Sequence, residues 1–210
     1  MPRRRLDLPG YPRHIGIRAV DGMTCFTCDM DSRVFLKYLR EAMDGTDLCL
    51  HAFVLMGNHV HLLLTTHTVG TVPKVMHRLC LQYARYFNRK YDRTGPLFEG
   101  RYWASLIGSQ GHFFEVMRYI ELNPVRAGLV DMPAQYPWSS HGHNTGRESR
   151  AEITPHDEFL QFGGSAADRQ SAWADFVAQG IRPPELERIR KHFRRNRPYG
   201  SDAFEKRFKK

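Results

Sequence analysis

The sequence predicts an α+β fold with a mainly antiparallel sheet, followed by a helical and basic extension. Three observations support this prediction. An apolar run broken by Gly57-Asn58 has the pattern of a β-hairpin. Residues 72–90 repeat apolar side chains at helical spacing. The expected elements follow the order β-α-β-β-α-β-α, which is a ferredoxin-like split βαβ arrangement with one added helix. We expect these helices on one face of the sheet.

The first part of the chain supplies three strands and a helix. Residues 14–19 predict a short strand, and residues 32–44 predict a helix that Asp31 or Ser32 can cap. The hairpin follows, with strands over residues 48–56 and 59–66. Short apolar runs bounded by turn residues are typical of strands.

A longer helix, a fourth strand and a third helix come next. The helix over residues 72–90 is followed by a strand over residues 102–107 and a helix over residues 110–123. This third helix should stop at Pro124, because a residue before proline is pushed out of helical geometry.

The rest of the chain reads as an extension. A loop-rich stretch leads to residue 145, where we place a boundary between a domain over residues 1–145 and an extension over residues 146–210. The extension should contain helices over residues 166–179 and 184–194, followed by a basic tail.

The chain is strongly basic. It has 31 Lys+Arg against 22 Asp+Glu, a net charge of +9 at pH 7, which favours nucleic acid or an acidic membrane surface as partner. It has no apolar run long enough to span a membrane. Arg3-Arg4-Arg5 is not followed by an apolar stretch, so no signal peptide is expected. The cysteines, four in number, are too few for a disulfide scaffold, so we expect reduced thiols and a cytoplasmic protein.

Two basic segments are candidates for contact with DNA. One face of the helix over residues 72–90 carries cations without acidic residues among them, which suits a phosphate backbone, although a solvated helix face has the same pattern. The second segment is the stretch 188–210, which we expect to contact nucleic acid and to belong to a class of tails that are often disordered when free. The candidate DNA-binding residues in these segments are Lys74, Arg78, Arg85, Arg89, Arg194, Arg195 and Arg197.

His59 and His61 form the most informative short pattern in the chain. Alternate side chains of a strand lie on one face, so both imidazoles should project from the same side of the hairpin. Two imidazoles held side by side suit a metal ion. Two histidines at this spacing are also common by chance, so the pattern depends on partners elsewhere in the chain.

Tyr119 and Asn123 are candidates for those partners. They are four residues apart on a predicted helix, so they lie on one face. With the two histidines, Asn123 would complete three metal ligands, and Tyr119 would be positioned as a nucleophile. A divalent metal polarises a phosphoryl oxygen, which suits attack on a phosphodiester. Taken alone, a tyrosine on an amphipathic helix is more often a core residue.

Five blocks follow one another in the chain. They are Met56–Leu63, with its His-hydrophobic-His signature, Tyr83–Asn88, Gly95–Tyr102, Arg118–Val130 and Tyr136–Ser140. In this order they resemble the HUH single-tyrosine transposases, in particular the bacterial REP-associated tyrosine transposases, and the resemblance covers about residues 9–140. One departure is Gly57, where the family usually has proline, and glycine also suits a tight turn.

The resemblance implies an HUH fold and a role for each candidate residue. His59 and His61 would bind Mg²⁺ or Mn²⁺, with Asn123 as third ligand. Tyr119 would attack a DNA phosphate, giving a 5′-phosphotyrosine and a free 3′-OH. Imidazole suits zinc, manganese or nickel better than Mg²⁺, so the working ion stays open.

The resemblance also implies a partner. This would be single-stranded DNA with a hairpin of the REP type, contacted in addition by Arg18, Arg101 and the Arg3-Arg4-Arg5 arm. Members of the group are thought to work as monomers, so we expect a bacterial monomer that associates with the nucleoid when bound. Two other functions stay open: a protein that binds DNA hairpins without cutting them, and a metal-dependent hydrolase that uses water in place of Tyr119.

Overall fold

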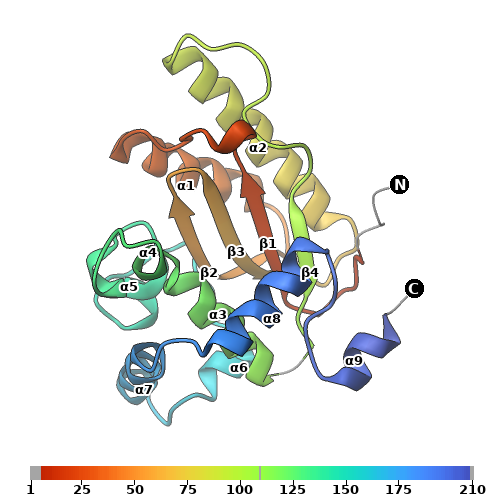
Figure 1. The fold of residues 1–210 in the computed structure, drawn as a ribbon, viewed down its shortest axis with the longest axis vertical. Helices are drawn as coiled ribbons and strands as arrows, with labels where there is room; N and C mark the ends of the chain where they lie inside the picture. The colour runs from red at the N-terminus through yellow and green to blue at the C-terminus, as the bar shows by residue number, and fades with distance from the viewer. Residues whose placement is uncertain (1–5, 109, 209–210) are drawn as a thin grey trace.

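The computed structural model of the protein describes residues 6–108 and 110–208, so the Arg3-Arg4-Arg5 arm lies outside the described residues. The sheet has the strand order β2-β3-β1-β4, and each neighbouring pair is antiparallel. This order confirms the predicted α+β class and its split βαβ arrangement (Figure 1). The elements up to the last strand are β1 (Arg13–Arg18), the 3₁₀ turn η1 (Val20–Gly22), α1 (Asp29–Met43), β2 (Cys49–Met56), β3 (His59–Thr65), α2 (Thr71–Lys90) and β4 (Trp103–Leu106).

One face of the sheet packs against α1 and α2. Alternate strand residues point to this side, as Ile15 and Ile17 do on β1. Phe35 of α1 and Leu79 and Tyr83 of α2 meet them, and all five side chains are buried. Burial of each large apolar side chain stabilises the fold by about 1.5–3 kcal/mol.

The opposite face is covered by α3 (Gln110–Glu121) and α8 (Pro183–Arg194), as Figure 1 shows. The expectation of helices on one face was therefore wrong for the chain after β4. The cause lies in β2, where Phe53 points to the first face while Ala52 and Val54 point to the second and are fully buried. A strand that is apolar on both sides needs a cover on both sides.

Asp31 caps α1 from inside its first turn, although it was expected to precede the helix. α1 begins at Asp29, so Asp31 lies inside its first turn. The Oδ2 atom of Asp31 accepts N–H groups from Thr27 at 2.8 Å and Cys28 at 3.1 Å. Asp31 thus satisfies free donors at the helix start from within the helix.

The helix with Tyr119 ends earlier than predicted, and a second helix follows at once. α3 ends at Glu121, and α4 (Asn123–Arg126) begins with Pro124 in its first turn. Proline is tolerated there because the N–H it lacks would have no helical partner. The prediction of one helix to residue 123 was therefore wrong, and Asn123 opens the new helix.

The chain after residue 145 does not stand apart from the rest. Trp173, Ile189 and Tyr199 are buried in the same cluster as Phe113 of α3, so the predicted boundary separates two stretches that share a core. The basic tail is folded as far as Phe208. The elements of this part that have not yet been given are η2 (Pro133–Gln135), α5 (His141–Asn144), α6 (Asp157–Leu160), α7 (Ala166–Ala178) and α9 (Asp202–Arg207).

None of the helices in the described ranges is long and apolar enough to cross a membrane.

Candidate active site

His59 and His61 lie side by side on β3. Their ring centroids are 5.2 Å apart. The Nδ1 atom of His59 lies 2.7 Å from Oδ1 of Asn58, and the Nδ1 atom of His61 lies 2.9 Å from Nε2 of His14 on β1. Both rings therefore keep their Nε2 atoms outside these hydrogen bonds. An Nε2 lone pair is the form in which imidazole binds a cation.

Burial keeps these imidazoles neutral. It lowers the pKa of His59 to about 4, with the positive charges of Arg18 and Arg126 adding to the effect. It lowers the pKa of His14 to about 3, again with a contribution from Arg126. The pKa of His61 lies well below its ordinary value, because of burial and then because of the neighbouring imidazoles. Metals bind neutral imidazole, so no proton has to leave these rings at neutral pH.

Tyr119 of α3 lies against the same rings. Its centroid is 5.6 Å from that of His61 and 5.6 Å from that of His14. The guanidinium carbon of Arg126 lies 4.2 Å from the centre of the Tyr119 ring, and its Nη1 donates to the Tyr119 carbonyl at 3.0 Å. The fold thus brings a phenol, imidazoles and a guanidinium together from β1, β3, α3 and α4.

The Asn123 amide is engaged with its own helix and with Arg126. Nδ2 donates to the carbonyl oxygens of Tyr119 at 3.0 Å and Ile120 at 3.4 Å. Oδ1 accepts from Nη2 of Arg126 at 2.9 Å. An amide oxygen has two acceptor sites, so Oδ1 keeps one. The role of Asn123 as a metal ligand stays a prediction.

The donors at this place fit a divalent metal ion. Neutral imidazole nitrogens and an amide oxygen suit ions such as Mn²⁺. Within the described part of the chain, no group of three or more histidine, cysteine or carboxylate side chains could hold a metal ion. A third protein ligand beside His59 and His61 would therefore be a side chain of another kind, as Asn123 is.

Helix α8 covers this site, which sequence reasoning did not anticipate. The ring of Phe193 stacks on His14, with centroids 4.0 Å apart and planes at 20°, and lies 5.1 Å from His61. The backbone of Gly16 lies directly beneath it, since a Cβ atom there would be 2.3 Å from the Phe193 ring. Tyr119 is left 5 % exposed. No periodic pattern could have linked Phe193 to a strand so far back in the chain.

An ion pair and a hydrogen bond attach the C-terminal part of the chain to α3, the helix that carries Tyr119. Arg118 of α3 donates to Glu185 of α8 at 2.7 Å, and both side chains are almost fully buried. Tyr199 donates its hydroxyl to Glu115 of α3. Since Arg118 precedes Tyr119 directly, the first contact fixes α8 next to the nucleophile candidate.

Glu121 is a second residue that sequence reasoning missed. Its carboxylate is fully buried and accepts four hydrogen bonds: from Ser140 at 2.9 Å, Asn144 at 2.7 Å, His141 at 2.9 Å and Trp173 at 2.9 Å. These contacts join α3 to α5 and α7. A lone glutamate in a helical pattern carries no signal for such a network.

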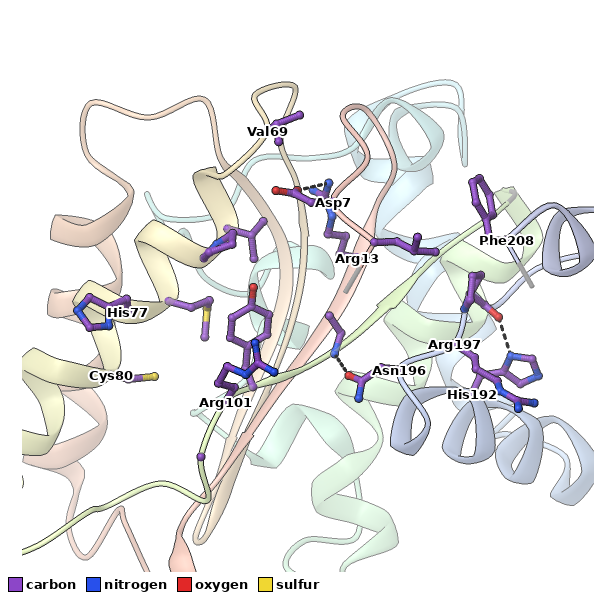
Figure 2. A pocket seen from close by; sticks show the side chains of 18 of the residues that line it. Asp7, Arg13, Val69, His77, Cys80, Arg101, His192, Asn196, Arg197 and Phe208 are labelled. Atoms are coloured by element: carbon purple, nitrogen blue, oxygen red, sulfur yellow. Dashed lines mark hydrogen bonds and ion pairs between the residues drawn. The ribbon is translucent and has the colours of Figure 1, made fainter. Parts of the chain in front are cut away.

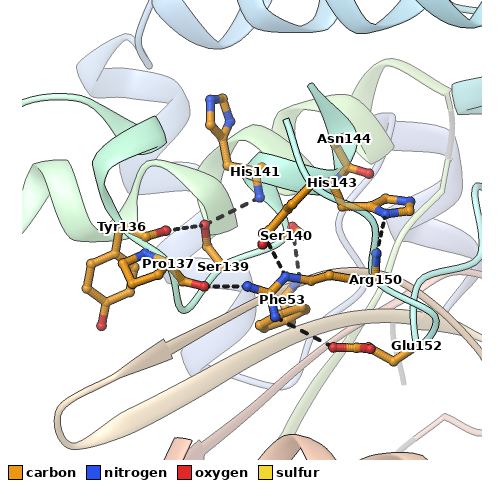
Figure 3. A network of polar contacts seen from close by, with 12 residues as sticks. Phe53, Tyr136, Pro137, Ser139, Ser140, His141, His143, Asn144, Arg150 and Glu152 are labelled. Carbon is orange, nitrogen blue, oxygen red and sulfur yellow. Dashed lines mark hydrogen bonds and ion pairs between the residues drawn. The ribbon is translucent and has the colours of Figure 1, made fainter. Parts of the chain in front are cut away.

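The segment around α5 is fixed to the sheet as well. Phe53 of β2 donates its N–H to the Ser140 hydroxyl at 3.2 Å, and Arg150 donates to the carbonyl of Pro137. Figure 3 shows this segment folded over β2, with Arg150 between Pro137 and Glu152. The partners of Glu121 in this segment, Ser140, His141 and Asn144, are thus held against the sheet on which the site is built.

Comparison with known proteins gives the family. The family described as "Transposase IS200 like" matches residues 14–123, slightly more than half of the chain. The chain belongs to this family. The matched range starts at His14 and ends at Asn123, so it contains the histidines, Tyr119 and Asn123, while Arg126 and Phe193 lie beyond it.

Two individual proteins are similar to this IS200-like transposase family member. A Haemophilus influenzae protein that carries the name REP-associated tyrosine transposase is 28% identical over an alignment of 122 residues. The match covers 50% of this chain and 64% of that protein. A solved structure of a REP-associated tyrosine transposase bound to a REP hairpin has a TM-score of 0.57 at 15% identity. It covers 75% of this chain and 96% of its own, which shows a shared fold.

The predicted DNA-binding residues of this IS200-like family member fall on separate surfaces. Arg18 ends β1 beside His59 and lies 3.8 Å from Glu99. The cations of α2 lie on its exposed side, opposite the stripe that packs on the sheet, as the spacing predicts. These exposed residues are Lys74, Arg78, Arg85 and Arg89.

Arg101 and Arg197 both line a groove between α2, β4 and the α8–α9 segment. The groove has a volume of about 1160 Å³, and Figure 2 shows Arg101 and Arg197 together with Arg13 around it. Arg13 is buried and bonds Asp7 through Nη2 at 2.9 Å, while its Nε and Nη1 have no hydrogen-bond partner among the residues that the structure describes. Arg194 and Arg195 are exposed at the end of α8. The groove therefore gathers positive charge from elements far apart in the sequence.

Proposed function

We propose that this protein cleaves and rejoins single-stranded DNA at hairpins of the REP type, through a metal-dependent reaction with a 5′-phosphotyrosine on Tyr119. The observation that carries the proposal is the contact of the Tyr119 ring with His61, which lies beside His59 on β3. Membership of a transposase family supports the reaction class. The similarity to a REP-associated tyrosine transposase, and to a structure of one bound to a REP hairpin, supports the substrate.

The proposed reaction exchanges one phosphodiester for another. The Tyr119 hydroxyl oxygen attacks the phosphorus and loses its proton to solvent, and a bond forms between the two atoms. The bond from phosphorus to the 3′ oxygen breaks, and that oxygen takes up a proton to become a free 3′-OH. The 5′ side stays on the tyrosine, so its energy is kept for attack by a 3′-OH that releases Tyr119 again.

His59, His61 and Asn123 are the residues that would hold Mg²⁺ or Mn²⁺, the histidines through Nε2 and the asparagine through Oδ1. When bound, the ion supplies Lewis-acid polarisation of a phosphoryl oxygen. Arg126 contributes a positive charge beside the Tyr119 ring, where negative charge develops on the attacking oxygen and the phosphate. The buried setting strengthens both electrostatic effects, because the effective dielectric constant there is lower than in water.

The partner in this proposal is a DNA hairpin with a single-stranded flank, bound by one protein molecule. Arg18 lies next to the histidine pair, and the groove with Arg101 and Arg197 offers a second contact. The basic side of α2 offers a third. Since most of this affinity would come from phosphate contacts, binding should weaken steeply as salt rises.

A labelled DNA hairpin with a single-stranded flank, incubated with the protein and Mn²⁺, tests the proposal. We expect a protein–DNA adduct that survives denaturant and is lost in Tyr119→Phe, which removes only the hydroxyl. His59→Ala and Asn123→Ala should reduce the adduct while DNA binding persists. Cleavage that persists in Tyr119→Phe would overturn the tyrosine mechanism in favour of hydrolysis by water, and tight binding with no cleavage under any metal would favour a binding protein.

A further inference from the structure

His14 is a buried histidine directly beside the candidate metal pair. It lies on the central strand β1, and only 1% of it is exposed. Its Nε2 atom is 2.9 Å from Nδ1 of His61, and its ring contacts those of Tyr119 and Phe193. It was not among the residues expected to form the site.

His59 and His61 each use the Nδ1 atom for a hydrogen-bond contact with a neighbouring side chain. Asn58 donates Nδ2 to the carbonyl of Gly22 at 3.2 Å, so its Oδ1 faces Nδ1 of His59. An amide oxygen can only accept, so His59 carries its proton on Nδ1 and keeps a lone pair on Nε2. His61 makes its Nδ1 contact with His14 instead of an amide.

Only one arrangement of protons between His14 and His61 allows a metal to bind through Nε2. If His14 donated to Nδ1 of neutral His61, the His61 proton would sit on Nε2 and block that atom. If His61 donates from Nδ1, its Nε2 lone pair is free, and both histidines of the pair then have the same tautomer. Metal-bound histidines ordinarily donate their other N–H to an acceptor that fixes ring orientation and tautomer.

We propose that His14 is a positioning residue that accepts the Nδ1 proton of His61 and so holds the His61 Nε2 lone pair toward the metal, as Asn58 does for His59. This inference rests on the proposed metal-dependent function. His14 itself does not touch the metal or the DNA in this scheme. Phe193, stacked on the other side of the His14 ring, keeps that ring in its place.

Mn²⁺ binding to the DNA-free protein tests the inference, followed by calorimetry or by the paramagnetic signal of the free ion. His14→Phe keeps an aromatic ring but removes the acceptor, and it should weaken Mn²⁺ binding about 10–100-fold. His14→Gln keeps an acceptor near the Nε2 position and should restore most of the affinity. His51→Gln is the matched control, because His51 is buried on the same sheet with partners of its own, Thr65 and Thr154.

A second readout does not depend on metal affinity. Nitrogen chemical shifts of the imidazoles report which ring nitrogen carries the proton, and we expect the Nδ1–H form for His61 in the unaltered protein and in His14→Gln. An Nε2–H form of His61 in the unaltered protein would overturn the inference. So would unchanged Mn²⁺ affinity in folded His14→Phe while His61→Ala abolishes binding. Unchanged affinity in His61→Ala itself would instead refute the metal site of the proposed function.

Discussion

The ring of Phe193 stacks on that of His14 with a centroid distance of 4.0 Å and an angle of 20° between the planes. One residue belongs to the last long helix of the chain and the other to its first strand. Their contact leaves no room for a side chain on Gly16, where a Cβ atom would lie 2.3 Å from the Phe193 ring. The geometry of the histidine cluster therefore depends on a residue far outside it.

Gly16→Ala should test this packing. The new methyl group forces Phe193 away from the sheet, and overpacking of this kind costs about 1–3 kcal/mol in the free energy of unfolding. Urea unfolding measures the loss. The double variant Gly16→Ala/Phe193→Ala should lose less free energy of unfolding than the sum of the two single variants, because the clash is then absent. Gly111→Ala is the control, since a Cβ atom there meets nothing within 4 Å.

Glu121→Gln should destabilise the tyrosine helix. The buried carboxylate accepts four hydrogen bonds, and an amide in its place would turn an NH₂ group toward one or two of these donors. We expect a loss of about 3 kcal/mol in the free energy of unfolding. Glu99→Gln changes the same group at a partly exposed place and should stay within about 0.5 kcal/mol of the unaltered protein. An equal effect of both changes would contradict the role of the network.

Stability should fall as pH drops from about 6.5 toward about 4. Burial lowers the pKa of His14 to about 3, and of His51 and His59 to about 4. In this window the unfolded chain binds protons on these histidines and the folded chain does not. Each such proton stabilises the unfolded state and lowers the free energy of unfolding. Each histidine contributes up to about 1.4 kcal/mol per pH unit. Urea midpoints between pH 7 and pH 4.5 measure the slope, and His51→Gln should reduce it by the share of one histidine. A flat profile would contradict the neutral, buried histidines.

Arg101→Gln and Arg197→Gln should weaken binding of a labelled DNA hairpin and reduce its dependence on salt. If each residue contacts one phosphate, its loss lowers the slope of log affinity against log salt by roughly one unit. Arg40→Gln removes the same charge from the exposed end of α1, away from the groove, and should change the slope little. Equal effects of all three changes would show that only net charge matters.

Local patterns in the sequence were enough to predict the sheet and the helices of the first half. The turn at Gly57-Asn58 and the apolar runs beside it predicted β2 and β3, and helical spacing predicted α2 to within a residue. Strand alternation also predicted that His59 and His61 share a face, and their rings are indeed adjacent.

The parts that could not be predicted depend on contacts between distant residues. Phe193 reaches back to β1, and Glu121 collects donors from α5 and α7. Neither contact can be predicted from sequence periodicity, because each partner has the pattern of an ordinary helical residue in its own segment. The same holds for His14, whose role depends on which strand lies beside β1 in the sheet.

The position of β1 has a consequence for how the protein is made. Chains are synthesised from the N-terminus, so the strand with His14 and Gly16 leaves the ribosome long before Phe193 does. Until α8 follows, the sheet face with the histidine cluster is covered by α3 without α8, and a nascent chain or a fragment that ends near residue 145 lacks Trp173, Ile189 and Tyr199, which complete that core. Folding of this face is therefore completed only when α7 and α8 have been translated.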